Sequence, residues 1–159
     1  MRAVVQRVRD ARVEVGEKVV GSIGFGLLVY VGVRRGDVES DVTYLSQKIL
    51  GLRIFPDAGG KMNLSLLDLR ADRSPGDPQS PGILVVSQFT LYGDVRKGRR
   101  PSYNEAAPPG DAEPVYEALL TSLANNGVPP QSGLFQEHMD VIYTNDGPVT
   151  ILIDTEQDR

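Results

Sequence analysis

The sequence predicts an α+β fold of mainly antiparallel, barrel-like β-sheet with two packed helices. Segments rich in β-branched residues lie at both ends of the chain, and between them two segments change to helical spacing of apolar residues. Hydrophobic residues make up 40% and charged residues 24% of the sequence, which is an ordinary globular balance. With 159 residues, the chain is expected to form one domain, 1–159.

The first 33 residues predict strands. Apolar and polar residues alternate through 3–8, and Gly16-Glu17-Lys18 interrupts the pattern as a hairpin turn does. Residues 26–33 are apolar on both faces, which is typical of a strand buried from both sides. This strand is therefore expected in the core.

Two segments predict amphipathic helices. From Asp37 onward, apolar residues recur every three or four positions up to Ile49, with Asp37 as the expected N-cap and Gly51 near the end. A second helix is expected to open at Asp111 and to end at Asn126-Gly127.

The remaining segments are shorter. Residues 53–55 predict a strand ended by Pro56, and 61–67 fit either a strand or irregular structure. Residues 70–82 hold three prolines and two glycines, so an exposed, mobile loop is expected. Residues 83–91 predict a buried strand, and 139–144 with 149–153 predict two strands around a turn at 145–148.

Composition excludes several classes of chemistry. The sequence has no Cys and a single His, His138, so thiolate metal sites, cysteine nucleophiles and His-rich metal sites are excluded. We expect no metal and no cofactor. The net charge of −4 argues against unselective binding of nucleic acid. Charges interrupt the apolar residues at the N-terminus, and no run approaches the roughly 18 apolar residues of a membrane helix, so a soluble, cytoplasmic protein is expected.

Polar residues at the end of the strand 83–91 suggest a functional site. Ser87, Gln88 and Thr90 follow four apolar residues, and backbone N–H groups there could stabilise an oxyanion. Structural strands often end in the same way, so this pattern alone is not specific.

Two further segments have both a structural and a functional interpretation. The residues from Asn145 to Pro148 fit an ordinary hairpin turn, although a cis bond before Pro148 would point two successive carbonyls in one direction. Between Asp94 and Ser102, four cations stand against one acid, which fits either a solvated loop or a phosphate-binding patch. The four cations are Arg96, Lys97, Arg99 and Arg100.

Taken together, the segments resemble the bacterial and eukaryotic D-aminoacyl-tRNA deacylases, which remove wrongly attached D-amino acids from tRNA. The resemblance runs nearly end to end. It is carried by MRAVVQRV at 1–8, GSIG at 21–24, KMNLS at 61–65, SQFTL at 87–91, GRRPS at 98–102, EAAPP at 105–109 and NDGPVT at 145–150.

The resemblance implies a homodimer of single deacylase domains that hydrolyse the ester of D-aminoacyl-tRNA. Gly147-Pro148, joined by a cis bond, would reach into the partner's site and read the chiral centre, with Arg7 and Asn145 supporting them. The segment from Ser87 through Gln88 and Phe89 to Thr90 would stabilise the oxyanion while the terminal ribose hydroxyl assists water. Thr90 is expected to position groups and not to act as the nucleophile, because no base lies near it in sequence.

The sequence departs from the family pattern in two places. The loop 70–82 is longer than expected, and Gln136 and Glu137 replace small residues in the segment before Met139. The role of His138 is open, and so are the preferred amino acid and tRNA.

The D-specific function has one expected extension, and two alternative functions stay open. Achiral glycyl-tRNA is expected as a further substrate of a D-specific enzyme. A sister editing enzyme, with a trans Gly-Pro bond, removes L-alanine from a threonine tRNA. A non-catalytic nucleic-acid-binding module would instead use the cations of 94–102.

Overall fold

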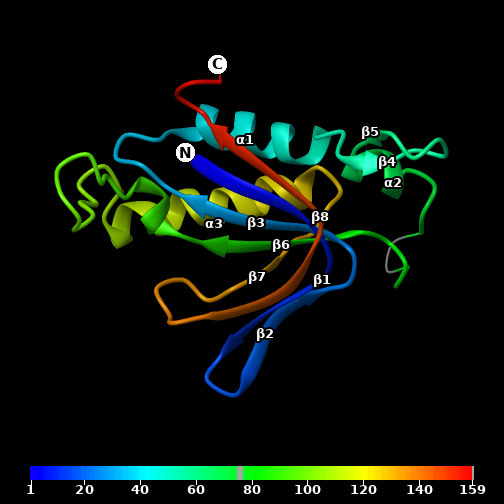
Figure 1. Cartoon of the computed structure of the whole chain (residues 1–159), viewed down its shortest axis with the longest axis horizontal. Coiled ribbons are helices and arrows are strands. Elements are labelled where there is room, and N and C mark those ends of the chain that lie inside the picture. Colours follow the sequence, from blue (N-terminus) through cyan, green and yellow to red (C-terminus); the bar gives the residue numbers. More distant parts are fainter. Residues whose placement is uncertain (75–76, 159) are drawn as a thin grey trace.

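The computed structural model describes residues 1–74 and 77–158 (Figure 1). Its main sheet has the strand order β2-β1-β3-β6-β7, and β8 pairs with the other edge of β1. The strands of this sheet are β1 (Arg2–Val15), β2 (Lys18–Ile23), β3 (Gly26–Gly32), β6 (Gly82–Ser87), β7 (Gln131–Ser132) and β8 (Asp140–Asp154). A second, two-stranded sheet contains β4 (Phe55–Pro56) and β5 (Met62–Leu64).

Most strand pairs are antiparallel, as predicted. β1 pairs antiparallel with β2, β3 and β8, whereas β3 with β6 and β6 with β7 are parallel pairs. β2 approaches β7 so closely that a Cβ on Gly21 would lie 2.5 Å from the carbonyl oxygen of Ser132. The sheet therefore curls into a nearly closed barrel, which confirms the expected architecture.

Both predicted helices are present. α1 (Glu39–Gly51) and α3 (Pro109–Asn125) pack side by side on one face of the sheet (Figure 1), where the hydroxyl groups of Ser46 and Ser122 lie 2.8 Å apart. α3 begins two residues before the expected Asp111, because Pro109 suits the first helical position. A third, five-residue helix, α2 (Leu66–Arg70), was not predicted.

The predicted cap of α1 is wrong by one residue. Val38 occupies the N-cap position, and its N–H donates to Asp41 at 2.9 Å. Asp37 is used elsewhere, because its carboxylate accepts hydrogen bonds from the ammonium group of Met1 at 2.7 Å and from the N–H of Arg34 at 2.6 Å.

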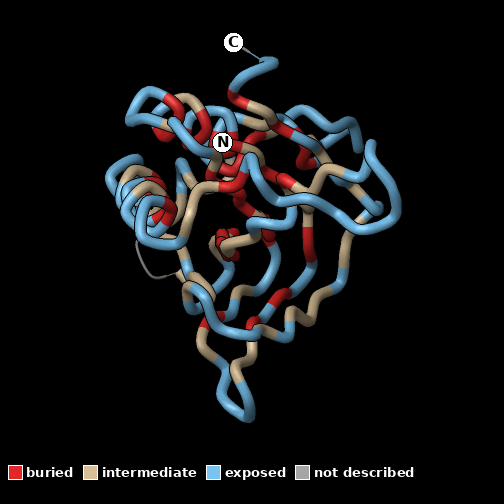
Figure 2. Tube along the Cα trace, turned by 90° about the vertical axis from the view of Figure 1, so that its left-hand side faces the viewer, coloured by how far each residue is buried: buried red, intermediate tan, exposed pale blue. Residues whose placement is uncertain are grey.

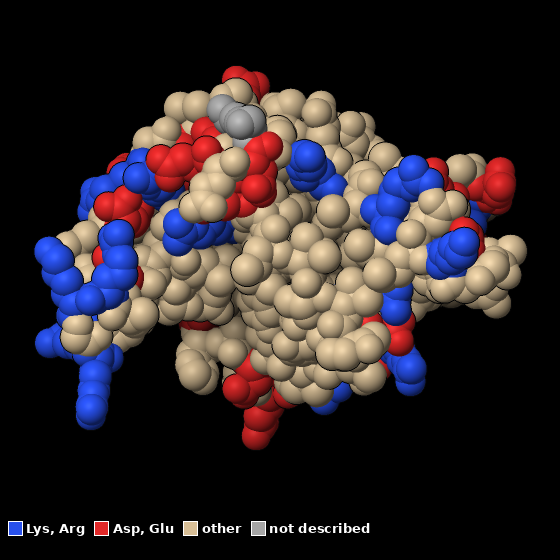
Figure 3. All heavy atoms as spheres, turned by 45° about the horizontal axis from the view of Figure 1, so that its top comes forward, with Lys and Arg blue, Asp and Glu red and all other residues tan. Residues whose placement is uncertain are grey.

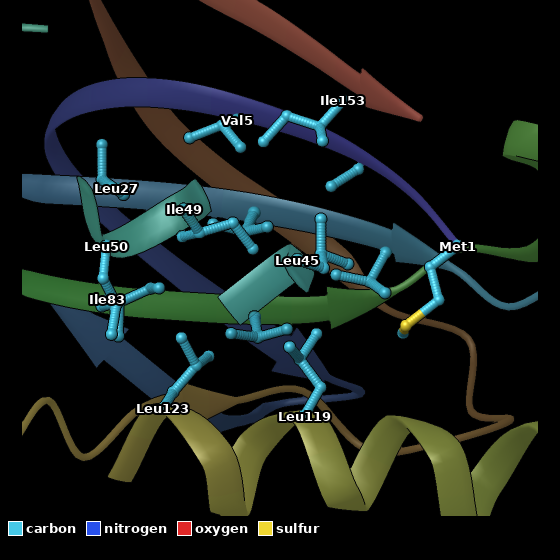
Figure 4. Packing of buried hydrophobic residues seen from close by; sticks show 14 of the residues in the cluster. Met1, Val5, Leu27, Leu45, Ile49, Leu50, Ile83, Leu119, Leu123 and Ile153 are labelled. Atoms are coloured by element: carbon cyan, nitrogen blue, oxygen red, sulfur yellow. The ribbon is translucent and has the colours of Figure 1, made fainter. Parts of the chain in front are cut away.

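Apolar side chains fill both sides of β3, which explains its continuous apolar sequence. Leu27, Val29 and Val31 point toward the helices, whereas Leu28 packs inside the curled sheet. Figure 4 shows how α1 and α3 meet the sheet through Leu45, Ile49, Leu119 and Leu123. Figure 2 shows buried residues gathered in the interior and the exposed β1–β2 hairpin projecting below.

Two predicted strand segments are wrong in part. β6 ends at Ser87, and the chain then forms a 3₁₀-helix, η1 (Phe89–Tyr92), instead of continuing to residue 91. Residues 139–153 form no hairpin, because β8 is one strand that pairs with β1 along nearly its whole length. Residues 146–149 are instead a bulge within β8.

The shorter segments also differ from expectation. The strand expected at 53–55 is limited to β4, which includes Pro56, and 61–67 divides into β5 and the start of α2. Of the loop 70–82, residues 75–76 lie outside the described residues. On either side of them, Arg70 donates to the carbonyl oxygen of Pro81 at 2.7 Å, and Arg73 pairs with Asp77 at 3.0 Å.

Within the two described ranges, no helix has both the length and the apolar character needed to cross a membrane.

Candidate active site

A pocket of about 530 Å³ opens at the carboxyl ends of the parallel strands β3 and β6. This end of parallel strands is a common position for ligand sites, because the loops that follow the strands can surround a ligand. Apolar side chains from several elements form most of its wall. They include Val31, Val33, Val86, Ala112, Phe135 and Met139.

The first candidate segment lies at this pocket. Ser87, Gln88 and Phe89 line it, and the N–H of Gln88 donates to the carbonyl oxygen of Val31 at 2.7 Å. This bond is the last between the two strands, after which the chain turns into η1. The change from strand to 3₁₀-helix at this point is why the polar residues gather here.

Two backbone donors at the start of η1 lack a partner. Among the described residues, no acceptor faces the N–H groups of Phe89 or Thr90, as expected for the first residues of a helical turn. The side-chain amide of Gln88 donates to Oγ1 of Thr90 at 2.5 Å. The pattern of donors is compatible with stabilisation of a developing negative charge.

An aromatic pair stands beside these donors. Phe89 and Tyr103 meet edge to face, with ring centroids 5.1 Å apart, and both line the pocket. Phe89 keeps 57% of its surface exposed, which is unusual for so large an apolar side chain. Tyr116 lies deeper, and burial raises the pKa of its hydroxyl group, which donates to the carbonyl oxygen of Val85 at 3.0 Å.

The second candidate segment forms the bulge of β8. Gln6 pairs with Thr150 and Val8 with Asn145, so the four residues 146–149 stand opposite Arg7 alone. The bond between Gly147 and Pro148 is cis, as expected. Both residues are exposed, and Gly147 has a φ of 115°, a conformation that favours glycine.

Arg7 and Asn145 hold the bulge from both sides. Nε of Arg7 donates to Asp146 at 2.8 Å, and Nη1 of the same side chain donates to the carbonyl oxygen of Ile54 at 2.6 Å. The side-chain amide of Asn145 donates to the carbonyl oxygens of Arg7 at 3.0 Å and of Val149 at 3.1 Å. The ends of the bulge are thus tied to β1.

The two candidate segments do not share a site within one chain. Ser87 and Phe89 line the pocket, whereas none of its described lining residues comes from the bulge or from Arg7. The sequence motifs therefore mark two separate surfaces of the subunit.

The basic segment forms an exposed loop closed by backbone hydrogen bonds between Asp94 and Ser102. Figure 3 shows Lys and Arg side chains projecting at the left end of the molecule, where Figure 1 places this loop. Arg96 is neutralised locally, because two of its nitrogens contact Asp94 at 2.8 and 2.9 Å and lower the pKa of that carboxyl group to about 2. Within the described structure, no ion pair involves Lys97, Arg99 or Arg100.

Sequence reasoning missed several residues around these sites. Arg35 and Tyr103 line the pocket, and Asp146 orients Arg7. Tyr103 directly follows the basic segment, so an aromatic residue beside a cationic loop was the available signal. Asp146 stands within the second motif but was interpreted only as part of a turn.

Comparison with known proteins identifies the family. The model of the family described as D-Tyr-tRNA(Tyr) deacylase matches residues 4–154. This chain belongs to that family. Two members named D-aminoacyl-tRNA deacylase, from Thermosipho africanus and Halothermothrix orenii, are 51% and 52% identical to it over 157 residues, which is 99% of this chain and 99% of each relative.

Solved structures share the deacylase-family fold. A protein described as c-Myc DNA unwinding element binding protein is 38% identical and superposes with a TM-score of 0.86, with 97% of this chain and 98% of that chain covered. A probable eukaryotic D-amino acid tRNA deacylase superposes with a TM-score of 0.70 over 96% of this chain and 97% of that chain. At 18% identity, the second likeness concerns the fold alone.

Proposed function

We propose that this chain is a hydrolase that cleaves the carboxylic ester bond of D-aminoacyl-tRNA, releasing free D-amino acid and tRNA. Family membership over residues 4–154, with relatives near 50% identity that bear this name, is the observation that carries the proposal. Chiral proofreading of translation follows from this activity. We propose one deacylase domain over 1–159 that works in the cytoplasm.

The pocket supplies groups that suit ester hydrolysis. A water oxygen adds to the ester carbonyl carbon, and the bond from this carbon to the ribose oxygen then breaks. The free N–H group of Phe89, which lines the pocket with Ser87 and Gln88, suits the oxyanion of the intermediate, and the next residue, Thr90, has a second free N–H group although it does not itself line the pocket. The terminal ribose hydroxyl of the tRNA, and not a protein base, would assist the water.

Thr90 has a positioning role in this mechanism. Its hydroxyl oxygen accepts the hydrogen bond from Gln88, and among the described residues no His or carboxylate contacts it. An unassisted hydroxyl group is a weak nucleophile. Gln88 and Thr90 would therefore hold each other, and with them the backbone donors, in place.

Chiral selection requires a homodimer in this proposal. Gly147 and Pro148 lie away from the pocket of their own chain, and both are exposed, so they are available to enter the pocket of a second copy. Leu152, farther along β8, keeps 77% of its surface exposed, as an apolar residue of a subunit interface does in the isolated subunit. Rigid backbone groups can exclude one enantiomer at the Cα atom without contacting the side chain of the amino acid. Achiral glycyl-tRNA would then also be accepted.

The tRNA partner is bound at two places. Its 3′ acceptor end occupies the pocket, and its phosphates contact the loop 94–102. Lys97, Arg99 and Arg100 are free for this role, whereas Arg96 already pairs with Asp94 and contributes less.

One solved structure favours a second candidate function. The protein that is 38% identical is described as a binding protein for a DNA element, so a nucleic-acid-binding module without catalysis is the competing hypothesis. Charge reversal at Arg99 and Arg100 would abolish such a function, whereas changes at Gly147 would not.

The decisive experiment compares the hydrolysis of D-tyrosyl-tRNA and L-tyrosyl-tRNA at low enzyme concentration. Rapid loss of the D ester with the L ester spared is the expected result. Cleavage of L-alanyl-tRNA in its place would favour the sister editing enzyme. Binding of tRNA without cleavage of any ester would favour the binding module.

A further inference from the structure

The segment from Leu134 to Met139 makes a tight turn at the edge of the pocket. The N–H of Glu137 donates to the carbonyl oxygen of Leu134 at 3.4 Å, and Gln136 has a φ of 64°. Gln136 is the one described residue other than glycine with a positive φ. Such backbone conformations persist in residues other than glycine where the surroundings fix them, often at functional sites.

The turn brings a carboxylate to the substrate pocket. Glu137 lines it and is exposed, and no described side chain forms an ion pair with its carboxylate. Phe135, Met139 and Val141 form the adjoining wall. These apolar side chains lower the local dielectric on one side of the carboxylate, which strengthens its attraction for a cation inside the pocket.

Among the described residues, none of the other ionisable groups at the pocket forms an ion pair with Glu137. Arg35 comes from the segment after β3, and its Nε donates to the carbonyl oxygen of Asn104 at 3.1 Å, with no described carboxylate as a partner. Burial raises the pKa of the Tyr116 phenol, which is therefore neutral near pH 7. His138 is almost fully exposed, and its Nε2 lies 4.0 Å from a carboxylate oxygen of Asp140.

We propose that the carboxylate of Glu137 binds the α-ammonium group of the aminoacyl ester and thereby favours aminoacyl esters over uncharged esters. The inference rests on the proposed function, because every amino acid attached to tRNA through its carboxyl group has this ammonium group. Glu137 would thus recognise the positive charge next to the chiral centre. It belongs neither to the segment that supplies the oxyanion donors nor to the bulge of β8.

The test is a comparison of two substrates with the Glu137→Gln variant. D-Tyrosyl-tRNA carries the ammonium group, and the corresponding α-hydroxyacyl-tRNA carries a hydroxyl group of similar size in its place. We expect the substitution to lower kcat/KM about 5- to 10-fold for the aminoacyl ester and less than about 2-fold for the hydroxyacyl ester. Taking the ratio of variant to wild type for each ester removes their different intrinsic reactivity.

Asp140→Asn is the matched control, because Asp140 is a nearby exposed carboxylate outside the pocket lining and should affect neither ester. Equal losses for both esters, or no loss for either, would overturn the inference. If the hydroxyacyl-tRNA is not cleaved, its inhibition constant against D-tyrosyl-tRNA gives the same comparison. Failure of the wild-type protein to cleave D-tyrosyl-tRNA would instead reject the proposed function.

Discussion

Nε of Arg7 lies 2.8 Å from a carboxylate oxygen of Asp146, and this ion pair joins the middle of β1 to the bulge that holds Gly147 and Pro148. Only 13% of the Arg7 side chain is exposed, so the pair is poorly screened by solvent. Because the same guanidinium also contacts the carbonyl oxygen of Ile54, Arg7 fixes the bulge against the segment before β4. The bulge is thus held by a side chain that belongs to neither candidate segment, 87–90 or 145–148.

Loss of this ion pair should loosen chiral selection before it abolishes catalysis. Arg7→Leu removes the donor to Asp146 and Ile54, and we expect about 2 kcal/mol lower stability and a D/L selectivity reduced by at least about tenfold. Arg12→Leu is the control, because Arg12 pairs with Glu14 on the exposed surface. Selectivity of hydrolysis and urea unfolding would be measured; full selectivity in Arg7→Leu would contradict the role.

Gly147→Ala should distort the bulge. A Cβ on Gly147 would lie 2.8 Å from Cγ2 of Val149 and 2.9 Å from its backbone nitrogen, at a φ of 115° that L residues rarely adopt. We expect a cost of about 1 to 3 kcal/mol and partial acceptance of L-tyrosyl-tRNA. Gly24→Ala is the control, because nothing lies within 4 Å of a Cβ there. Unchanged rejection of the L ester would argue against the bulge as selector.

The cations of the loop 94–102 should contribute unequally to tRNA binding. Replacing Arg99 or Arg100 with Ala should each reduce the slope of log K against log salt by about 0.7 to 0.9. Arg96→Ala should have a smaller effect, because the carboxylate of Asp94 already neutralises Arg96. The pKa of Asp94 is lowered to about 2, so this carboxylate stays ionised at any ordinary assay pH. Titrations between about 50 and 200 mM salt measure these slopes. Equal effects of all three substitutions would contradict the expected smaller contribution of Arg96 to tRNA binding.

Leu152→Glu should dissociate the proposed dimer. Placing a charge at an apolar side chain that is 77% exposed in the single chain leaves the fold unaffected but opposes burial between subunits. Light scattering should report a monomer, and hydrolysis should fall because each pocket then lacks the partner's bulge. Val19→Glu, at an exposed apolar residue of β2, is the comparison. A variant that stays dimeric and active would show that β8 forms no interface at Leu152.

Gln136→Gly and Ala118→Gly should change stability in opposite directions. Gln136 has a φ of 64°, where glycine relieves about 1 to 2 kcal/mol of steric energy, although its greater freedom when unfolded offsets part of this gain. Ala118 is exposed within α3, where glycine costs about 1 kcal/mol. Urea unfolding of both variants measures the difference, and a clear loss of stability in Gln136→Gly would contradict the expected sign.

The elements best predicted from the sequence are those whose signals are local. Helical spacing located α1 and α3, and the turn at Gly16 located the β1–β2 hairpin. The hairpin predicted for 139–153 is wrong because Asn145-Asp146-Gly147-Pro148 fits a hairpin turn and a bulge equally well. What decides between them is pairing with β1, more than 130 residues away in the sequence, as the Gln6–Thr150 pair illustrates.

The candidate site shows the same division between local and distant information. The segments 87–90 and 145–148 could be singled out because polar residues and glycine interrupt apolar strands. Their location on separate surfaces, and the contacts of Arg7 with Asp146 and Ile54, depend on the three-dimensional arrangement of β1, β4 and β8. No local pattern records such contacts, so the role of Asp146 was missed, whereas Tyr103 was missed although it directly follows the cationic loop.

The bulge in β8 allows the residues that are proposed to select the substrate to change without altering the sheet that carries them. Pairing of β8 with β1 resumes on both sides of residues 146–149, so a change within these four positions leaves the register of the flanking strand unchanged. An insertion elsewhere in the strand would move every later side chain to the opposite face of the sheet. Related proteins could therefore acquire a different substrate preference here while keeping the same barrel and the same buried core.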